Sequence, residues 1–219
     1  MAAETLTFSA VFPPALLSLV SVAALVLSDY HNRRPGRYLF KPLAAAAFIW
    51  LALQLDALSR SYGTWMLVGL CLCMLGDLFL MPDNERWFLA GLVAFLCGHL
   101  VYAAAFVQLS FYPWGVAISA LPALVLLVQV LRWLLPHVDS NMKIPVALYT
   151  VVITCMLLFA GGTAGSTAAY LIILGAWAFA LSDIAVARRQ FVASDPVNQL
   201  WGTPLYFLAQ MILAASIAA

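Results

Sequence analysis

The sequence predicts an all-α membrane protein: eight transmembrane helices, arranged as two parallel four-helix repeats around a central cavity. Three observations support this. The chain is 65% hydrophobic and 9% charged, whereas a soluble domain is roughly half apolar and about a quarter charged. Its apolar runs are long enough to cross a bilayer, which takes about 20 residues each. Its basic residues fall almost entirely into alternate loops.

The first half of the chain contains four apolar runs with short polar connections. The first run lacks the positively charged start and small-residue cleavage site of a signal peptide, so we expect a retained helix. The connections are the basic segment 31–36, the region of Arg60 and the polar turn 82–85. The predicted spans are 8–28, 41–58, 62–82 and 86–108.

The second half repeats this organisation. Turn-forming glycines at 161–162 end its second run, and the segment 194–196 separates the last two. No linker or soluble domain is left over, so residues 1–219 are interpreted as a single integral membrane domain. The predicted spans are 112–135, 142–160, 166–187 and 200–218.

The distribution of lysine and arginine predicts the orientation. Nine basic residues fall in the loops on one side, and Arg60 is alone on the other. The positive-inside rule then places both termini on the non-cytoplasmic side, in the plasma or inner membrane if the protein is bacterial. The nine are Arg33, Arg34, Arg37, Lys41, Arg86, Arg132, Lys143, Arg188 and Arg189.

Three pairs of segments, in the same order, predict an internal repeat of about 1–110 and 111–219. An even number of spans per unit would make the repeats parallel. The aspartates Asp77 and Asp183 would then lie at equal depth, about 7–9 Å inside the cytoplasmic boundary, facing a common cavity. The matched segments are 41–43 with 143–145, 76–78 with 182–184, and 95–100 with 206–211.

Asp77 and Asp183 are the strongest candidates for function. An ionisable residue at the centre of a membrane helix costs roughly 2.5–3.5 kcal/mol on insertion scales, so it indicates a functional site. Two carboxyl groups in one poorly hydrated cavity cannot both ionise cheaply, and one is expected to keep its proton. Such a pair could supply a general acid with a base or a cation stabiliser. The alternative is that both only form interhelical hydrogen bonds.

Other polar residues in the spans have two interpretations each. His99 could be a satisfied histidine of the helix bundle or could shape the cavity. Lys41 could snorkel to the interface or bind a substrate phosphate. Tyr149 and Gln210 could join helices or contact a substrate.

Several classes of chemistry are not indicated. No second histidine or cysteine stands at ligand spacing from His99, so no metal is expected. The motifs of serine hydrolases, zinc proteases and phosphate-binding loops are missing, and no cofactor is expected. The chain has no basic tract, so nucleic acid is not an expected partner. The four cysteines are interpreted as apolar fillers.

Several segments resemble the YhhN-like lysoplasmalogenase family, from about Lys41 to the C-terminus. The G-D-x-x-L-M segment at 76–81 is followed by a G-L-x-x-F segment at 91–95, which leads to His99 and Tyr102. The S-D pair at 182–183 and the segment 206–210 follow in the family's order.

This resemblance implies an eight-span hydrolase that cleaves the vinyl ether bond of lysoplasmalogens, giving a fatty aldehyde and glycerophospho-ethanolamine or -choline. Its partners would be the lysophospholipid substrate and membrane lipids. The catalytic residues would be Asp77 and Asp183, with Asp183 preferred as the acid because Ser182 could hydrogen-bond a neutral carboxyl. The basic pair Arg188-Arg189 departs from the family pattern, which we expect to affect loop charge more than chemistry. The substrate-binding positions would be Lys41, His99, Tyr102, Tyr149, Ser182, Tyr206 and Gln210.

Two other functions fit the same residues. A small proton-coupled transporter could use membrane carboxylates as a relay, although transporters often have discontinuous helices and inverted repeats. A non-catalytic lipid-binding protein could use the same cavity. The sequence leaves open the preferences for headgroup and chain length, and the oligomeric state.

Overall fold

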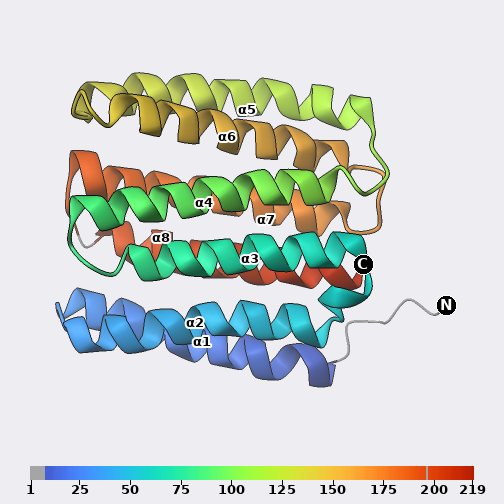
Figure 1. The fold of residues 1–219 in the computed structure, drawn as a ribbon, viewed down its shortest axis with the longest axis horizontal. Helices are drawn as coiled ribbons and strands as arrows, with labels where there is room; N and C mark the ends of the chain where they lie inside the picture. Colours follow the sequence, from blue (N-terminus) through green and yellow to red (C-terminus); the bar gives the residue numbers. More distant parts are fainter. Residues whose placement is uncertain (1–7, 196) are drawn as a thin grey trace.

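The computed structural model describes residues 8–195 and 197–219, which form long helices and contain no strand (Figure 1). Eight of these helices are long and apolar enough to cross a membrane, so the chain is an integral multi-pass membrane protein, as the sequence predicted. They are α1 (Phe8–Tyr30), α2 (Arg34–Gln54), α3 (Ser61–Phe79), α4 (Glu85–Phe106), α5 (Pro113–Leu134), α6 (Lys143–Gly162), α7 (Ala169–Ala187) and α8 (Val197–Ala215).

Four short helical segments complete the described chain. Three are 3-10 turns, and the fourth is a π-helical turn that continues α7 into the connection to α8. They are η1 (Ala57–Ser59), η2 (Leu135–His137), η3 (Arg188–Val192) and η4 (Ser216–Ala218).

The boundaries predicted for the second span are wrong. Helix α2 begins at Arg34, seven residues before the predicted start at 41, and it ends at Gln54 rather than at 58. Pro35 lies in its first turn, where a missing backbone N–H costs nothing. Asp56 ends the helical region with a left-handed φ of 51°. The hydropathy window missed the charged first two turns; the other seven spans agree with the helices to within three residues.

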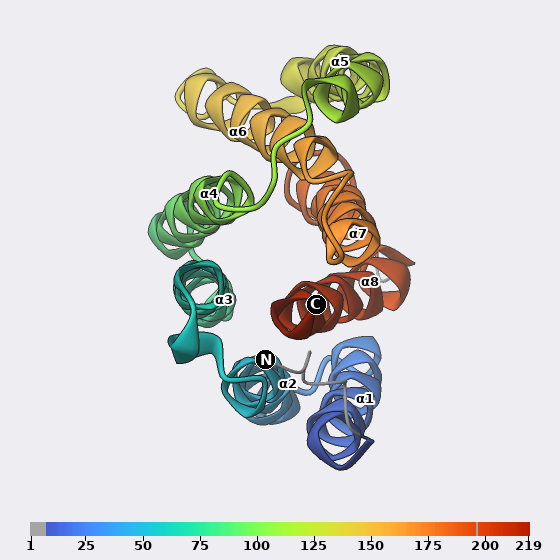
Figure 2. The ribbon, with the colours of Figure 1, turned by 90° about the vertical axis from the view of Figure 1, so that its right-hand side faces the viewer.

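Seen along the bundle, six helices form a closed ring in the order α2, α3, α4, α6, α7, α8 (Figure 2). Helix α1 packs outside this ring against α2 and α8, and α5 packs outside it against α6. The ring order sets α2, α3 and α4 opposite α6, α7 and α8. This order is compatible with the proposed duplication, which stays a prediction.

Small residues bring α3 and α4 close together. A Cβ on Gly69 would lie 2.5 Å from the ring of Tyr102, and one on Gly76 would lie 2.6 Å from the ring of Phe95. Close approach at small residues is the usual way membrane helices associate, because lipid tails leave little hydrophobic drive between them. Because these glycines have no side chain, the rings of Tyr102 and Phe95 can pack directly against the backbone of α3.

The side of the membrane on which each end of the bundle lies remains a prediction from the basic loops. Ser110 lies in the turn between α4 and α5, and Asp139 lies between α5 and α6, at the opposite end of the bundle (Figure 1). A membrane-impermeant maleimide should label Ser110→Cys in intact spheroplasts and Asp139→Cys only in inside-out vesicles. The unsubstituted chain is the control, since its four cysteines all lie within helices. The reverse labelling pattern would invert the proposed orientation.

Candidate active site

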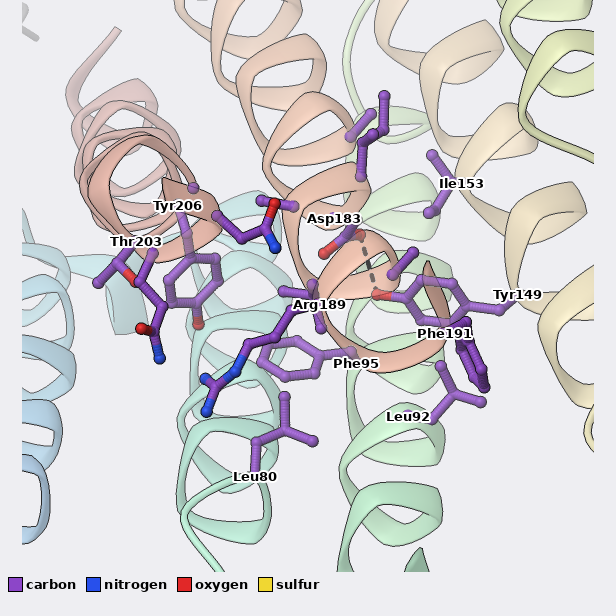
Figure 3. Close-up of a pocket in the computed structure, with 18 of the residues that line it drawn as sticks. Leu80, Leu92, Phe95, Tyr149, Ile153, Asp183, Arg189, Phe191, Thr203 and Tyr206 are labelled. Carbon is purple, nitrogen blue, oxygen red and sulfur yellow. Dashed lines mark hydrogen bonds between the residues drawn. The ribbon is translucent and has the colours of Figure 1, made fainter. Parts of the chain in front are cut away.

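A cavity of about 180 Å³ is lined by all eight helices, including α1 and α5, which pack outside the ring. Both membrane aspartates line it, Asp77 from α3 and Asp183 from α7. Two carboxyl groups that are more than a hundred residues apart in the chain therefore share one cavity, as the sequence pattern suggested. Figure 3 shows Asp183 among the aromatic and aliphatic side chains of the cavity.

Asp77 is held by an ion pair and a hydrogen bond. The Lys41 ammonium lies 3.1 Å from Oδ1 of Asp77 and also donates to the backbone carbonyl of Asp77 at 3.1 Å. The hydroxyl of Tyr206 donates to Oδ2 at 2.6 Å. Both carboxyl oxygens thus have a partner, as a group only 2% exposed requires. These contacts join α2 and α8 to α3.

Among the described residues, no lysine or arginine lies within ion-pair distance of Asp183. The hydroxyl of Tyr149 donates to its Oδ2 at 2.9 Å, and Nε2 of His99 lies 3.5 Å from the same oxygen (Figure 3 shows the tyrosine contact). Its side chain is 13% exposed, more than that of Asp77 at 3%. The carboxyl group of Asp183 therefore faces the cavity with neutral partners behind it.

The hydrogen bonds of His99 indicate where its proton lies. Its Nδ1 is 2.7 Å from the carbonyl oxygen of Phe95, which can only accept, so Nδ1 carries the hydrogen. In a neutral ring, Nε2 then presents a lone pair toward Asp183. A lone pair facing a carboxyl oxygen is favourable only when a proton lies between the two groups. The ring also stacks on Phe179, with centroids 4.3 Å apart, which fixes its orientation.

The two carboxyl groups have equivalent positions in the ring but different partners. Asp77 is contacted from α2 by Lys41 and from α8 by Tyr206. Asp183 is contacted from α6 by Tyr149 and from α4 by His99. One site therefore contains a fixed cation and the other does not. Carboxyl pairs in such unlike surroundings can divide into a proton donor and an ionised partner.

The sequence-predicted residues separate into two layers. Lys41, Tyr149 and Tyr206 line the cavity together with the aspartates. The remaining four are almost fully buried and lie behind the lining: His99, Tyr102, Ser182 and Gln210.

The residues behind the lining are held by hydrogen bonds to one another or to the backbone. Tyr102 donates to Oε1 of Gln210 at 2.7 Å, which joins α4 to α8. Ser182 donates to the carbonyl oxygen of Phe179 at 2.7 Å, within its own helix. It does not make the hydrogen bond to Asp183 that motivated the preference for that residue as the acid. The preference for Asp183 as the acid depends instead on its surroundings, because no lysine or arginine among the described residues lies within ion-pair distance of it.

The sequence did not predict the polar end of the cavity. Arg37 forms an ion pair with Asp29 at 2.8 Å, and both line the cavity, as do Arg189, Asn198 and Gln199. The only signal in the sequence was the pair Arg188-Arg189, which was interpreted as loop charge. Helix α2 begins earlier than expected, and this brings Arg37 onto the same helix as Lys41.

Residues 36–217 match the model of the YhhN family, which covers most of the chain. The chain belongs to the YhhN family. The rat and human proteins named lysoplasmalogenase TMEM86B are each 31% identical to it, covering 80% of this chain and 68% and 70% of their own lengths. Bovine lysoplasmalogenase TMEM86A is 27% identical, covering 77% of this chain and 72% of its own. No solved structure gives a significant match.

The part matched to the YhhN family contains Lys41 and both aspartates with their partners. All of α1 lies before it, yet α1 contributes Leu25 and Asp29 to the cavity. The polar end is therefore completed by a helix that the family match does not cover.

Lys41→Met should destabilise the protein, because it leaves the Asp77 carboxylate buried without its cation. Breaking a buried ion pair from one side costs roughly 3–5 kcal/mol. In the double variant Lys41→Met/Asp77→Asn most of this loss should return, giving a strongly non-additive cycle in thermal unfolding of the detergent-solubilised protein.

The matched control is Lys143→Met, at the start of α6, whose side chain is exposed and has no ion pair among the described residues. It should leave the unfolding temperature nearly unchanged. Additive losses in the Lys41 and Asp77 variants would show that the ion pair does not hold the site together.

Proposed function

We propose that this protein is a membrane hydrolase that cleaves the vinyl ether bond of lysoplasmalogens, releasing a fatty aldehyde and glycerophospho-ethanolamine or -choline. The observation that carries the proposal is one membrane cavity lined by two carboxyl groups in unlike surroundings. The names of the relatives support the substrate class, since they are lysoplasmalogenases that match across most of the chain.

The first step would be protonation of the carbon that lies β to the ether oxygen. In this step the double bond supplies the electron pair, and an oxocarbenium ion forms at the adjacent carbon and oxygen. Asp183 is the proposed acid, because no lysine or arginine among the described residues lies within ion-pair distance of it. The lone pair on Nε2 of His99 faces Oδ2 of Asp183, and this arrangement suits a carboxyl group that carries its proton.

Asp77 would stabilise the cation that forms. A carboxylate aimed at developing positive charge in a site that excludes water contributes more than it would in solution. Lys41 and Tyr206 hold the carboxylate in place, so it does not have to reorganise during the reaction. Asp77 would then accept a proton as a water molecule attacks the oxocarbenium carbon.

The hemiacetal formed in this way would break down to the aldehyde and the glycerol product, and in this step each aspartate would regain its starting protonation state. The Asp183 carboxylate would take the proton of the hemiacetal hydroxyl as the aldehyde forms. The leaving glycerol oxygen would take the proton held by Asp77. The net reaction consumes one water molecule and restores both carboxyl groups to their starting states.

The lining of the cavity suits an amphipathic substrate. Its polar end holds Asp29, Arg37 and Arg189, whereas the residues contributed by α4 and α5 are all apolar and those of α6 include Val146 and Ile153. We place the headgroup at the polar end and the alkenyl chain along the apolar wall, so that the ether lies at the aspartates between them. The apolar wall contains Phe88, Leu92, Leu126, Val130 and Ile153.

The polar residues that contact the aspartates, and those buried behind the lining, would position the catalytic groups. His99 and Tyr149 would orient Asp183, and Tyr206 would orient Asp77. Tyr102 and Gln210 would fix α4 and α8 relative to each other. Ser182 is proposed only to satisfy its own helix.

Asp183→Asn and Asp77→Asn should each lower aldehyde release by about 10²–10⁴-fold, the usual contribution of a general acid or base. An amide has nearly the same shape as a carboxyl but can neither give nor accept the required proton. Aldehyde can be measured with a coupled dehydrogenase, and folding by size-exclusion chromatography in detergent. Asp139→Asn, in the turn between α5 and α6, is the control and should keep full activity. More than a tenth of the activity in either folded variant would exclude the two-carboxyl mechanism.

The purified protein should hydrolyse a vinyl ether lysophospholipid and leave the matching acyl lysophospholipid intact. A carboxylic acid of sufficient strength protonates an enol ether, whereas ester hydrolysis needs an activated nucleophile. Turnover of both lipids at similar rates would indicate a lysophospholipase instead. Proton flux into liposomes without turnover of either lipid would favour the transporter.

A further inference from the structure

Arg189 lines the cavity and lies two residues beyond the end of α7, the helix that carries Asp183. It belongs to the π-helical turn η3, and its side chain lines the cavity (Figure 3). Such turns insert an extra residue into a helix and often occur at functional sites. Arg189 is therefore a candidate for direct contact with a bound molecule.

The neighbours of η3 direct Arg189 toward the cavity. The adjacent Arg188 donates to Oδ1 of Asn198, and Asn198 donates to the carbonyl oxygen of Ala193 at 2.7 Å. On the other side of the turn, the ring of Phe191 packs edge-on against Phe88 of α4, with centroids 5.7 Å apart. The turn is therefore anchored on both sides of Arg189.

Three cations line the cavity, and two of them are already paired with carboxylates. Arg37 contacts Asp29 at 2.8 Å and Asp83 at 3.5 Å. Lys41 contacts Asp77 at 3.1 Å. Within the described residues, Arg189 has no carboxylate at ion-pair distance.

The partner of Arg189 is neutral. In the orientation that its contacts require, the amide of Gln199 accepts from the two terminal nitrogens of Arg189 at 2.7 and 3.3 Å. An amide oxygen fixes the position of the guanidinium without neutralising its charge, and the carboxylates of Asp29 and Asp83 act on that charge only from beyond ion-pair distance. The charge remains available for an anion at the mouth of the cavity.

We propose that Arg189 binds the phosphate of the lysophospholipid headgroup, a subsite that rests on the proposed function. A guanidinium presents paired donors that match a phosphate, and such charge-assisted contacts are strong. Arg189 is six residues after Asp183, about 9 Å along a helix axis, which a long side chain reaches back across. In the substrate only the glycerol backbone separates the ether oxygen from the phosphate. Lys41 is not the phosphate ligand here, because it is committed to Asp77.

Arg189→Gln should raise KM for a lysoplasmalogen by about 10–100-fold and change kcat little, because the contact is remote from the reacting atoms. A 1-alkenylglycerol, which has the vinyl ether but no phosphate, should be turned over equally well by the variant and the parent. Arg189→Lys should give an intermediate KM, since an ammonium keeps the charge but loses the paired geometry. The control is Arg132→Gln, an exposed arginine of α5 outside the cavity lining, which should keep the parent KM. An unchanged KM in Arg189→Gln, or an equal loss on both substrates, would overturn the phosphate subsite.

A binding experiment separates this proposal from the proposed reaction. Titration of the parent, Arg189→Gln and Arg132→Gln with an acyl lysophosphatidylethanolamine can be followed by tryptophan fluorescence in detergent. Weakened binding in Arg189→Gln alone would support the subsite even if no lysoplasmalogen were hydrolysed. Equal binding by all three proteins would overturn it even if hydrolysis were observed. Parallel titrations with glycerophosphoethanolamine and inorganic phosphate distinguish a headgroup ligand from free phosphate.

Discussion

A carboxyl group among membrane helices is tolerated only where protein groups replace the water it has lost, and this constraint organises the interior of the molecule. The ion pair between Lys41 and Asp77 is the strongest case, because it joins two helices through opposite charges at 3.1 Å. Tyr206 adds a contact from α8, and Tyr149 joins α6 to Asp183 on α7. The polar contacts therefore hold together the same helices that form the cavity.

Aromatic residues pack together in the same part of the molecule as the two carboxyl groups. Phe95, Phe179 and Tyr206 contact one another edge to face, with centroids 5.5–6.2 Å apart. Phe179 also stacks on His99. Phe95 and Tyr206 line the cavity that both carboxyl groups share, and Phe179 is fully buried outside its lining. In surroundings this apolar, electrostatic interactions are stronger than in water. The polar contacts fix the positions of the two carboxyl groups, and the aromatic rings make their surroundings apolar.

The sequence predicted the number of helices and the shared cavity because both follow from composition and pattern. Apolar length gave eight spans, and two aspartates in matching segments suggested convergence. The start of α2 was missed because Arg34 and Arg37 lower the local hydropathy although they are helical. Ser182 was misjudged because its neighbour in sequence, Asp183, points to a different side of the helix.

Arg189 shows a different limit of sequence reasoning. The sequence shows that residue 189 is an arginine, but it does not show which residues surround its side chain. Whether an arginine is paired depends on residues that the fold brings near it, and Asp29, Asp77 and Asp83 pair with other cations instead. The π-helical turn that carries it has no residue pattern by which it could be read from the chain. A local pattern can thus identify a charged residue, whereas the balance of charges in a cavity requires the tertiary structure.

The ring order suggests how two similar carboxyl sites acquire different chemistry. Rotation of the ring by half a turn exchanges α2 with α6 and α4 with α8, which places Lys41 opposite Tyr149 and Tyr206 opposite His99. Each aspartate therefore receives one partner from each of two helices, and the half-turn exchanges these two pairs of helices. The decisive difference is a lysine in one half and a tyrosine in the other. An ammonium at 3.1 Å favours the ionised form of its carboxyl group, whereas the phenol and the imidazole beside Asp183 bring no fixed charge. The proposed acid and the proposed cation stabiliser thus differ in both of their partners, which are a tyrosine and a histidine at Asp183 and a lysine and a tyrosine at Asp77.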